Sequence, residues 1–198
     1  MSNMEVPKAN DNEASSGELA NRVLTIAPED WFRAVYPEIA ITSVEEMPAN
    51  FVQMMSNESV TDFTRMINKD IIFHCKLMNC KDLAFPYKMM RYRADIWEYY
   101  SNESGFTYDK IKPIYQVAIL MDPSCDNGVS SIVDNLSPSS GTTFSYPVIK
   151  VWELDAKDIV ERKLEGLYPL LPLMKNEAGA SKPKICRSYA LIKTYPAK

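Results

Sequence analysis

The chain has 198 residues, 46% of them hydrophobic and 24% charged, which are the proportions of a globular protein with room for one domain. Its net charge of −4 and pI of about 5.2 exclude nucleic-acid binding by bulk positive charge, so any such contact must come from a local patch. No apolar run approaches the roughly 18 residues of a membrane-spanning helix, and four irregularly spaced cysteines predict reduced thiols and a cytoplasmic location.

The two ends of the chain differ in composition from the middle. Residues 1–24 are rich in Asn, Ser and Glu and lack an apolar stretch, which predicts a disordered leader. Residues 25–174 carry the regular hydrophobic patterns and are expected to form the single domain. The tail over 175–198 mixes Lys, Pro, Ser and Tyr with weak periodicity, so its structure stays unassigned.

The first predicted element is a short helix over 27–36, where a proline and two acids precede large apolar side chains. Alternation over 39–46 predicts a strand, whereas the apolar residues at 51–55 fit either a short strand or the approach to the next one. Residues 60–67 and 70–78 predict two antiparallel strands, because Asn68-Lys69 between them is a plausible tight turn.

The second half of the domain begins with the longest helical pattern, over 85–100, where large apolar residues recur at helical spacing. A continuous apolar run over 111–121 predicts a buried strand. Residues 122–143 are rich in Ser, Asp, Asn and Gly and predict a long loop, either functional or disordered. The last predicted elements are an edge strand, a capped helix and a packed turn or broken helix, over 144–152, 155–166 and 167–174.

This order of elements predicts an α/β fold with a central mixed β-sheet flanked by helices. Within it, the strand over 70–78 carries the only histidine of the chain. Residues two apart in a strand share a face, so His74 and Lys76 project together while their neighbours project the other way. Burying a charge costs several kcal/mol unless it is paired or used. With Asp62 on the adjoining strand, these residues predict a functional site, first of all a metal-dependent nuclease site.

A series of motifs, in order, resembles the Rpn-type and transposase-associated branch of the PD-(D/E)XK nuclease superfamily. Asp62 matches the strand Asp of that branch, and 73–78 matches its strand of the form apolar-His-apolar-Glu-apolar-Gln. Asp82 matches a loop Asp, while Lys88 and Tyr92 match an Arg and a Tyr on the following helix. Further matches lie at 112–120, 148–153 and 166–173, so the resemblance spans roughly residues 28–174.

The resemblance implies a restriction-endonuclease-like αβββαβ core and hydrolysis of DNA phosphodiesters with Mg²⁺ or Mn²⁺. It implies catalytic roles for Asp62, His74 and Lys76, with the metal on Asp62 and His74 and help from an upstream acid such as Glu29 or Glu58. DNA is the expected partner, and a homodimer is left open. The phosphate contacts are expected on the helix over 85–100, from Lys88, Arg91 and Arg93.

The sequence departs from the family pattern at the metal site. Lys76 stands where the family has its second carboxylate, and Met78 where it has Gln or Lys. Hard divalent cations need oxygen ligands, so this exchange predicts impaired cleavage, with a catalytically inactive DNA- or protein-binding relative as the alternative.

Two other interpretations of Lys76 stay open. Lys76 could be the motif lysine, with His74 two residues before it as a ligand for Mn²⁺. The first register is preferred, because His74 matches a histidine that the family often has. Alternatively, Lys76 simply pairs with Asp62 in a metal-free pocket.

Overall fold

The computed structural model describes residues 24–47, 51, 62–78, 80–104, 112–137 and 140–175. A five-stranded sheet in the order β1-β2-β3-β4-β7 forms its centre. The first three strands are antiparallel, while β3, β4 and β7 run parallel. The strands are β1 (Val44–Glu46), β2 (Asp62–Ile67), β3 (Ile71–Met78), β4 (Ile114–Leu120) and β7 (Val148–Lys150).

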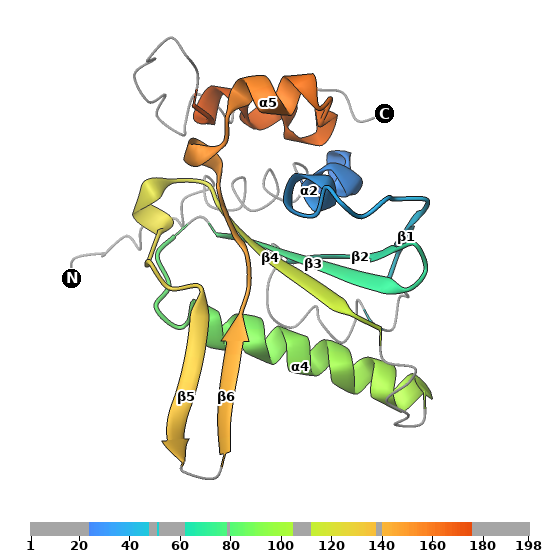
Figure 1. Ribbon diagram of the computed structural model, residues 1–198, viewed down its shortest axis with the longest axis vertical. Coiled ribbons are helices and arrows are strands. Elements are labelled where there is room, and N and C mark those ends of the chain that lie inside the picture. The colour runs from blue at the N-terminus through green and yellow to red at the C-terminus, as the bar shows by residue number, and fades with distance from the viewer. Residues whose placement is uncertain are drawn as a thin grey trace, which may run out of the picture.

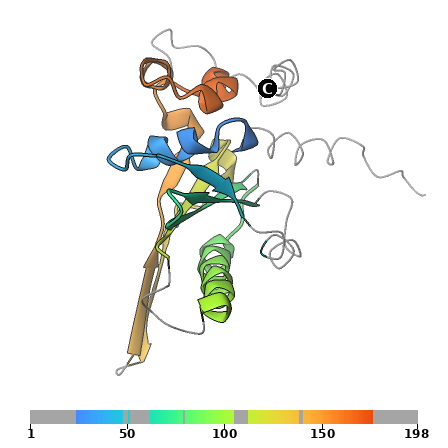
Figure 2. The same ribbon diagram turned by 90° about the vertical axis from the view of Figure 1, so that its right-hand side faces the viewer.

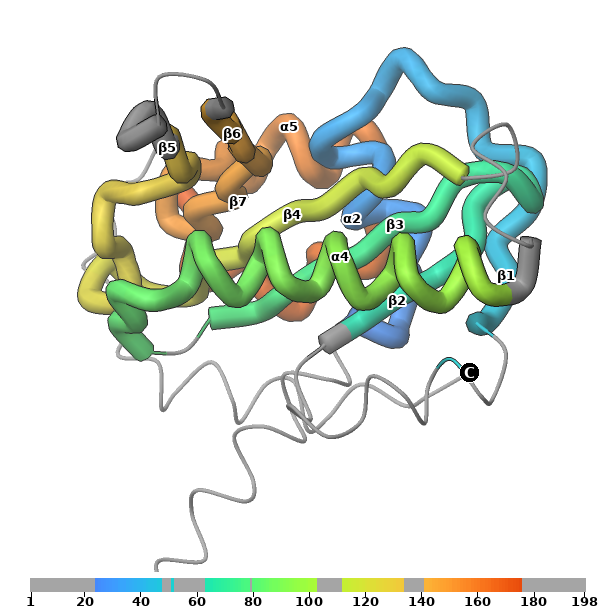
Figure 3. The backbone as a smooth tube through the Cα atoms, turned by 90° about the horizontal axis from the view of Figure 1, so that it is seen from below, coloured from blue at the N-terminus to red at the C-terminus, as the bar shows by residue number. Residues whose placement is uncertain are grey.

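Helices cover both faces of this sheet, as Figure 1 shows. The long helix α4 (Phe85–Ser104) lies against one face, and Figure 3 shows it in front of β2, β3 and β4. The other face carries three shorter elements: α2 (Pro28–Val35), α5 (Ala156–Glu161) and the 3-10 segment η4 (Glu165–Leu173). The predicted α/β fold, with a mixed sheet flanked by helices in the order αβββαβ, is therefore confirmed.

The turn between β2 and β3 follows from Asn68 and Lys69, which both adopt positive φ, at 54° and 67°. Asn tolerates this conformation better than most residues, and paired positive φ values suit a tight hairpin. The Asn68 side chain also holds the preceding segment: its Oδ1 accepts from the Thr42 N–H at 2.7 Å, and its Nδ2 donates to the Ala40 carbonyl at 2.7 Å. The predicted hairpin is confirmed, and it anchors the chain that leads into β1.

A buried carboxylate joins α2 to η4. Asp30, only 4% exposed, accepts a hydrogen bond from the Gly166 N–H at 2.9 Å and pairs with Arg33 at 3.1 Å. A side chain at Gly166 would meet Ala27 at 2.8 Å, so glycine is required for this close approach. The contact fixes η4 over the α2 face of the sheet.

The prediction of a long loop over 122–143 is wrong. After a short 3-10 turn, η2 (Pro123–Cys125), the chain forms a separate hairpin of β5 (Ser131–Ser137) and β6 (Ser140–Ser145). Figures 1 and 2 show this hairpin extending away from the sheet. Its strands pair with each other through the backbone, and the side chains described at 131–133 and 141–145 are mostly exposed, so the apolar alternation that marks a half-buried strand is missing there.

Two predicted strands are shorter than expected. Only Val44–Glu46 of 39–46 is a strand, because Asn68 side-chain bonds hold the residues before it in place of a ladder. Pro147 divides the strand expected over 144–152 into the end of β6 and the short β7. Residues 1–23 of the leader, 176–198 of the tail and 52–61 lie outside the described residues, whereas Leu24, the last residue of the predicted leader, is fully buried. Among the described helices, none is both long and apolar enough to cross a membrane.

Candidate functional site

A row of polar side chains crosses the sheet beneath α4. In the strand register, His74 of β3 lies opposite Thr64 of β2 and beside Gln116 of β4. His74 is fully buried, and Gln116 is only 3% exposed. On the same face of β3, the apolar Ile72 precedes His74, and Lys76 and then the apolar Met78 follow it. Buried polar groups of this kind are costly unless they are hydrogen-bonded, so their partners decide the character of the site.

Gln116 links the histidine to the covering helix. Its Nε2 donates to the Met89 carbonyl of α4 at 2.9 Å and lies 3.3 Å from Nδ1 of His74. An amide nitrogen donates hydrogen bonds, so Nδ1 of His74 is the acceptor in this contact. Nδ1 of His74 is thereby engaged by the Gln116 side chain.

Lys76 lies two residues along β3, on the same face as His74, and is only 7% exposed. Its Nζ stands 5.2 Å from the ring centroid of Tyr92, whose ring is also 5.3 Å from that of His74. An ammonium over an aromatic face gains about 0.5–2 kcal/mol. Tyr92, which the sequence match singled out, therefore covers both predicted catalytic residues of β3.

The two strands are adjacent and antiparallel, as predicted, and their register pairs position 62 of β2 directly with Lys76. The side chain of Asp62 lies outside the described part of the structure, and so does Glu58. The role of Asp62 as a metal ligand therefore stays a prediction. Glu29 belongs to α2, which covers the opposite face of the sheet, and it lines a shallow surface hollow with Arg33. The fold does not bring Glu29 to the α4 face.

Asp82, in the loop between β3 and α4, forms a second charged centre near Lys76. It pairs with Lys88 at 2.8 Å and accepts from the Ala84 N–H at 2.9 Å. The hydrogen bond from Lys88 is the main reason that the pKa of Asp82 is lowered, and the Lys76 charge adds to it. Asp82 therefore stays ionised, with its charge largely committed to Lys88.

The three basic residues of α4 have different surroundings. Lys88 is exposed but holds Asp82, whereas Arg91 is exposed and lies 5.8 Å from the Tyr92 ring. Arg93 is half-buried, donates to the Ile114 carbonyl at 2.9 Å and lies 5.0 Å from the Trp97 ring centroid. Burial lowers the pKa of Arg93. Arg93 thus fastens α4 to β4, while Arg91 is more accessible to a partner.

The described side chains do not fit a divalent metal ion. Among them, no three His, Cys, Asp or Glu residues lie close enough together to hold one. Nδ1 of His74 faces the Gln116 amide, Asp82 faces Lys88, and Lys76 brings positive charge to the site. Hard divalent cations prefer several carboxylate or carbonyl oxygens, which this set does not supply.

Gln116 is the site residue that sequence analysis did not single out. Its signal was present, because one amide stands within an apolar run that was predicted to be a buried strand. A polar residue in such a run needs a buried partner, and the parallel register supplies His74 as that partner. Only the pairing of β3 with β4 identifies Gln116 as a residue of the site.

Comparison with known proteins gives no relative for this chain: no family model, no curated protein and no solved structure matches it. The functional conclusion therefore rests on the fold of the chain and on the geometry beneath α4.

Proposed function

We propose that this chain is a DNA-binding relative of the PD-(D/E)XK nucleases in which metal-dependent cleavage of DNA is lost or strongly impaired. The observation that carries the proposal is the nearly buried Lys76, at the position where the family has its second metal-binding carboxylate. The αβββαβ order of elements and the motif series from Asp62 to 166–173 support the family relationship.

Electrostatics decides between cleavage and its loss. An ammonium held about 4 Å from a divalent cation is repelled by roughly 8 kcal/mol at an effective dielectric constant of about 20. Lys76 is only 7% exposed, so its side chain has little room to withdraw into solvent. The exchange from carboxylate to ammonium therefore removes a ligand and adds repulsion at the same point.

DNA binding is supported by the basic residues near this site in an otherwise acidic chain. Lys88 and Arg91 are exposed on α4, which covers the polar row. Phosphate contacts from such residues are tolerant of sequence and sensitive to salt. A local patch of this kind is the form of contact that a net charge of −4 allows.

A plasmid-nicking assay with Mg²⁺ and Mn²⁺ tests the loss of cleavage. The natural chain is expected to show little metal-dependent nicking. Lys76→Glu is expected to create or raise it, and more so when combined with Met78→Lys. Lys76→Met is the matched control, because it removes the charge without adding a ligand and should leave cleavage absent. Adding Asp62→Ala to the active variant should abolish the gained activity.

Strong cleavage by the natural chain would overturn the proposal. If that cleavage vanished in His74→Ala, the alternative register with His74 as ligand and Lys76 as the motif lysine would be established. Thermal unfolding of each variant separates a lost site from a lost fold.

Duplex binding is tested separately, in the presence of EDTA, by fluorescence anisotropy across a salt series. Lys88→Gln with Arg91→Gln is expected to weaken binding to all duplexes about equally and to reduce the salt slope by about 0.9 for each lost phosphate contact. Lys157→Gln, an exposed change on α5 across the sheet, is the control and should leave affinity unchanged. No binding by the natural chain at low salt would contradict the DNA-binding part and favour a protein-binding relative.

A further inference from the structure

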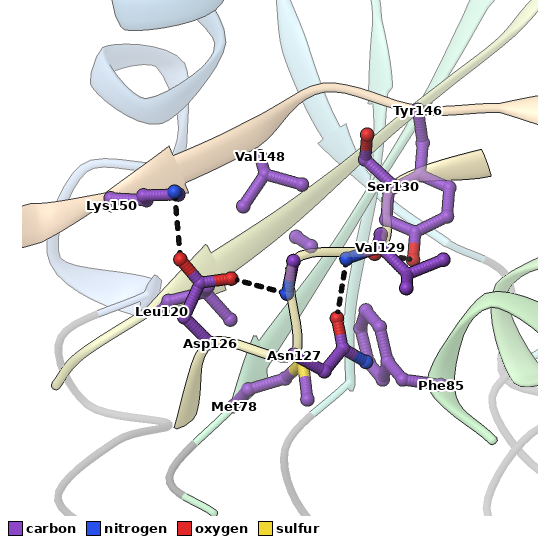
Figure 4. Close-up of a pocket in the computed structure, with 12 residues that line it drawn as sticks. Met78, Phe85, Leu120, Asp126, Asn127, Val129, Ser130, Tyr146, Val148 and Lys150 are labelled. Carbon is purple, nitrogen blue, oxygen red and sulfur yellow. Dashed lines mark hydrogen bonds and ion pairs between the residues drawn. The ribbon is translucent and has the colours of Figure 1, made fainter. Parts of the chain in front are cut away.

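A cavity of about 110 Å³ lies beside the polar row, at the carboxyl ends of the parallel strands β3, β4 and β7. Open α/β sheets commonly bind ligands at this edge. Figure 4 shows its apolar lining, to which each strand contributes: Met78 from β3, Leu120 from β4 and Val148 from β7. The rings of Phe85 and Tyr146 also line it and stand 5.9 Å apart.

The loop that borders the cavity is held in shape by its own side chains. Asp126 accepts from the Gly128 N–H at 2.8 Å, and Asn127 accepts from the Val129 N–H at 2.9 Å. Nδ2 of Asn127 donates to the Asp82 carbonyl at 2.7 Å, which joins this border to the loop that follows β3. A cavity built in this way is preformed, so a ligand would not need to order it.

One ion pair gives the cavity its polar side. Nζ of Lys150 lies 2.7 Å from Oδ2 of Asp126, and both residues line the cavity (Figure 4). Lys150 is the main reason that the pKa of Asp126 is lowered, and Asp126 in turn raises the pKa of Lys150, so the two stay charged. The pair presents a hydrogen-bond donor directly beside an acceptor, which complements a carbonyl oxygen next to an N–H group on one ligand edge.

The size of the cavity limits the ligand to a small ring. An engineered apolar cavity of about 150 Å³ in another protein binds benzene, so about 110 Å³ with an open side suits one six-membered ring and is small for a fused pair. Aromatic and apolar walls with a donor and acceptor at one side are the features by which proteins hold a nucleobase outside the base stack.

We propose that this cavity binds a single pyrimidine base, with Lys150 and Asp126 contacting its carbonyl and N–H edge. That the base comes from a nucleic acid rests on the proposed function, since Met78 of the cavity is two residues, about 6.6 Å, along β3 from Lys76. The backbone of a bound strand would then pass the polar row while one base enters the cavity.

Titration with thymidine, followed by NMR of the protein's methyl groups, tests this inference without DNA. Thymidine is expected to shift the Met78 methyl, and Val148→Phe, which fills the cavity, should abolish the shift. Val160→Phe makes the same change at an exposed position of α5 and should leave binding intact. Lys150→Met leaves the cavity open but removes the donor, and it should weaken thymidine binding at least tenfold.

Deoxyribose 5-phosphate and toluene are the comparison ligands, and deoxyguanosine tests ring size. The inference is overturned if thymidine does not bind, if toluene or deoxyguanosine binds as well as thymidine, or if deoxyribose 5-phosphate shifts the same methyl. Thymidine binding without duplex or single-strand binding would support a nucleoside site while contradicting the proposed function. DNA binding with no thymidine shift would contradict the site alone.

Discussion

The two faces of β3 share one backbone but bury very different side chains. Toward α2, the strand presents Phe73, Cys75 and Leu77, each at most 3% exposed within a continuous apolar core. Toward α4, it presents His74 and Lys76, which are buried nearly as deeply. Apolar burial stabilises the fold without further requirements, whereas each polar group needs a partner. The α2 face of β3 therefore belongs to the continuous apolar core, whereas the two polar side chains on its α4 face each depend on specific partners.

The largest effect is expected from breaking the apolar face. Phe73→Ala removes a fully buried ring whose centroid is 5.0 Å from that of Phe32 in an edge-to-face contact, and it should lower the free energy of unfolding by about 3–5 kcal/mol. Urea denaturation measures this, with Val160→Ala on the exposed side of α5 as a control that changes stability by less than about 0.5 kcal/mol. A loss below about 1 kcal/mol for Phe73→Ala would contradict the assignment of this face as the main core.

The polar row should respond differently, because its members depend on each other. Gln116→Leu alone strips Nδ1 of His74 and the Met89 carbonyl of their donor and should cost about 1–3 kcal/mol. His74→Leu with Gln116→Leu should cost clearly less than the sum of the two single changes, since both partners become apolar together. Denaturation of all four chains of this double-mutant cycle gives the coupling. Additive losses would mean that His74 and Gln116 do not act as a pair.

The two arginines of α4 are expected to have different roles: one stabilises the fold, and the other contacts a partner. Arg93→Met removes the charge-assisted bond to the Ile114 carbonyl and should lower stability by about 1–2 kcal/mol. Arg91→Met, at an exposed position, should change stability by less than about 0.5 kcal/mol and act on duplex affinity instead. Thermal unfolding and anisotropy on the same two variants check this. The reverse pattern would contradict the roles given to these side chains.

The smallest expected effect is on the acid stability of the loop beside Lys76. Because the pKa of Asp82 is below its value of about 3.9 in the unfolded chain, the ionised form stabilises the fold above about pH 4, and this stability is lost as the pH falls through the folded pKa. Lys88→Met removes the main cause of the shift, so it should flatten the decline in unfolding free energy below pH 4. Lys157→Met is the control. If the unfolding free energy of Lys88→Met declines below pH 4 as steeply as that of the natural chain, this ion pair contributes nothing to stability.

The sequence by itself determined the elements whose signals are local. Alternation predicted β3, helical spacing predicted α4, and Asn68-Lys69 predicted the turn before β3, because side-chain direction and φ preference depend on near neighbours. The two-residue period of a strand correctly set His74 and Lys76 on one face of β3. The register with position 62 depended on the turn: a two-residue turn would pair 62 with 75, whereas the three-residue turn over 68–70 pairs it with Lys76.

Only the tertiary structure decided what meets these residues. The parallel pairing of β4 with β3 selected Gln116 as the partner of His74, and the packing of α2 on the far face separated Glu29 from the site. The hairpin of β5 and β6 buries too little apolar surface to mark its strands in the sequence. The cavity joins Met78, Asp126 and Lys150, which no local pattern connects, because chain crossovers bring the carboxyl ends of β3, β4 and β7 together.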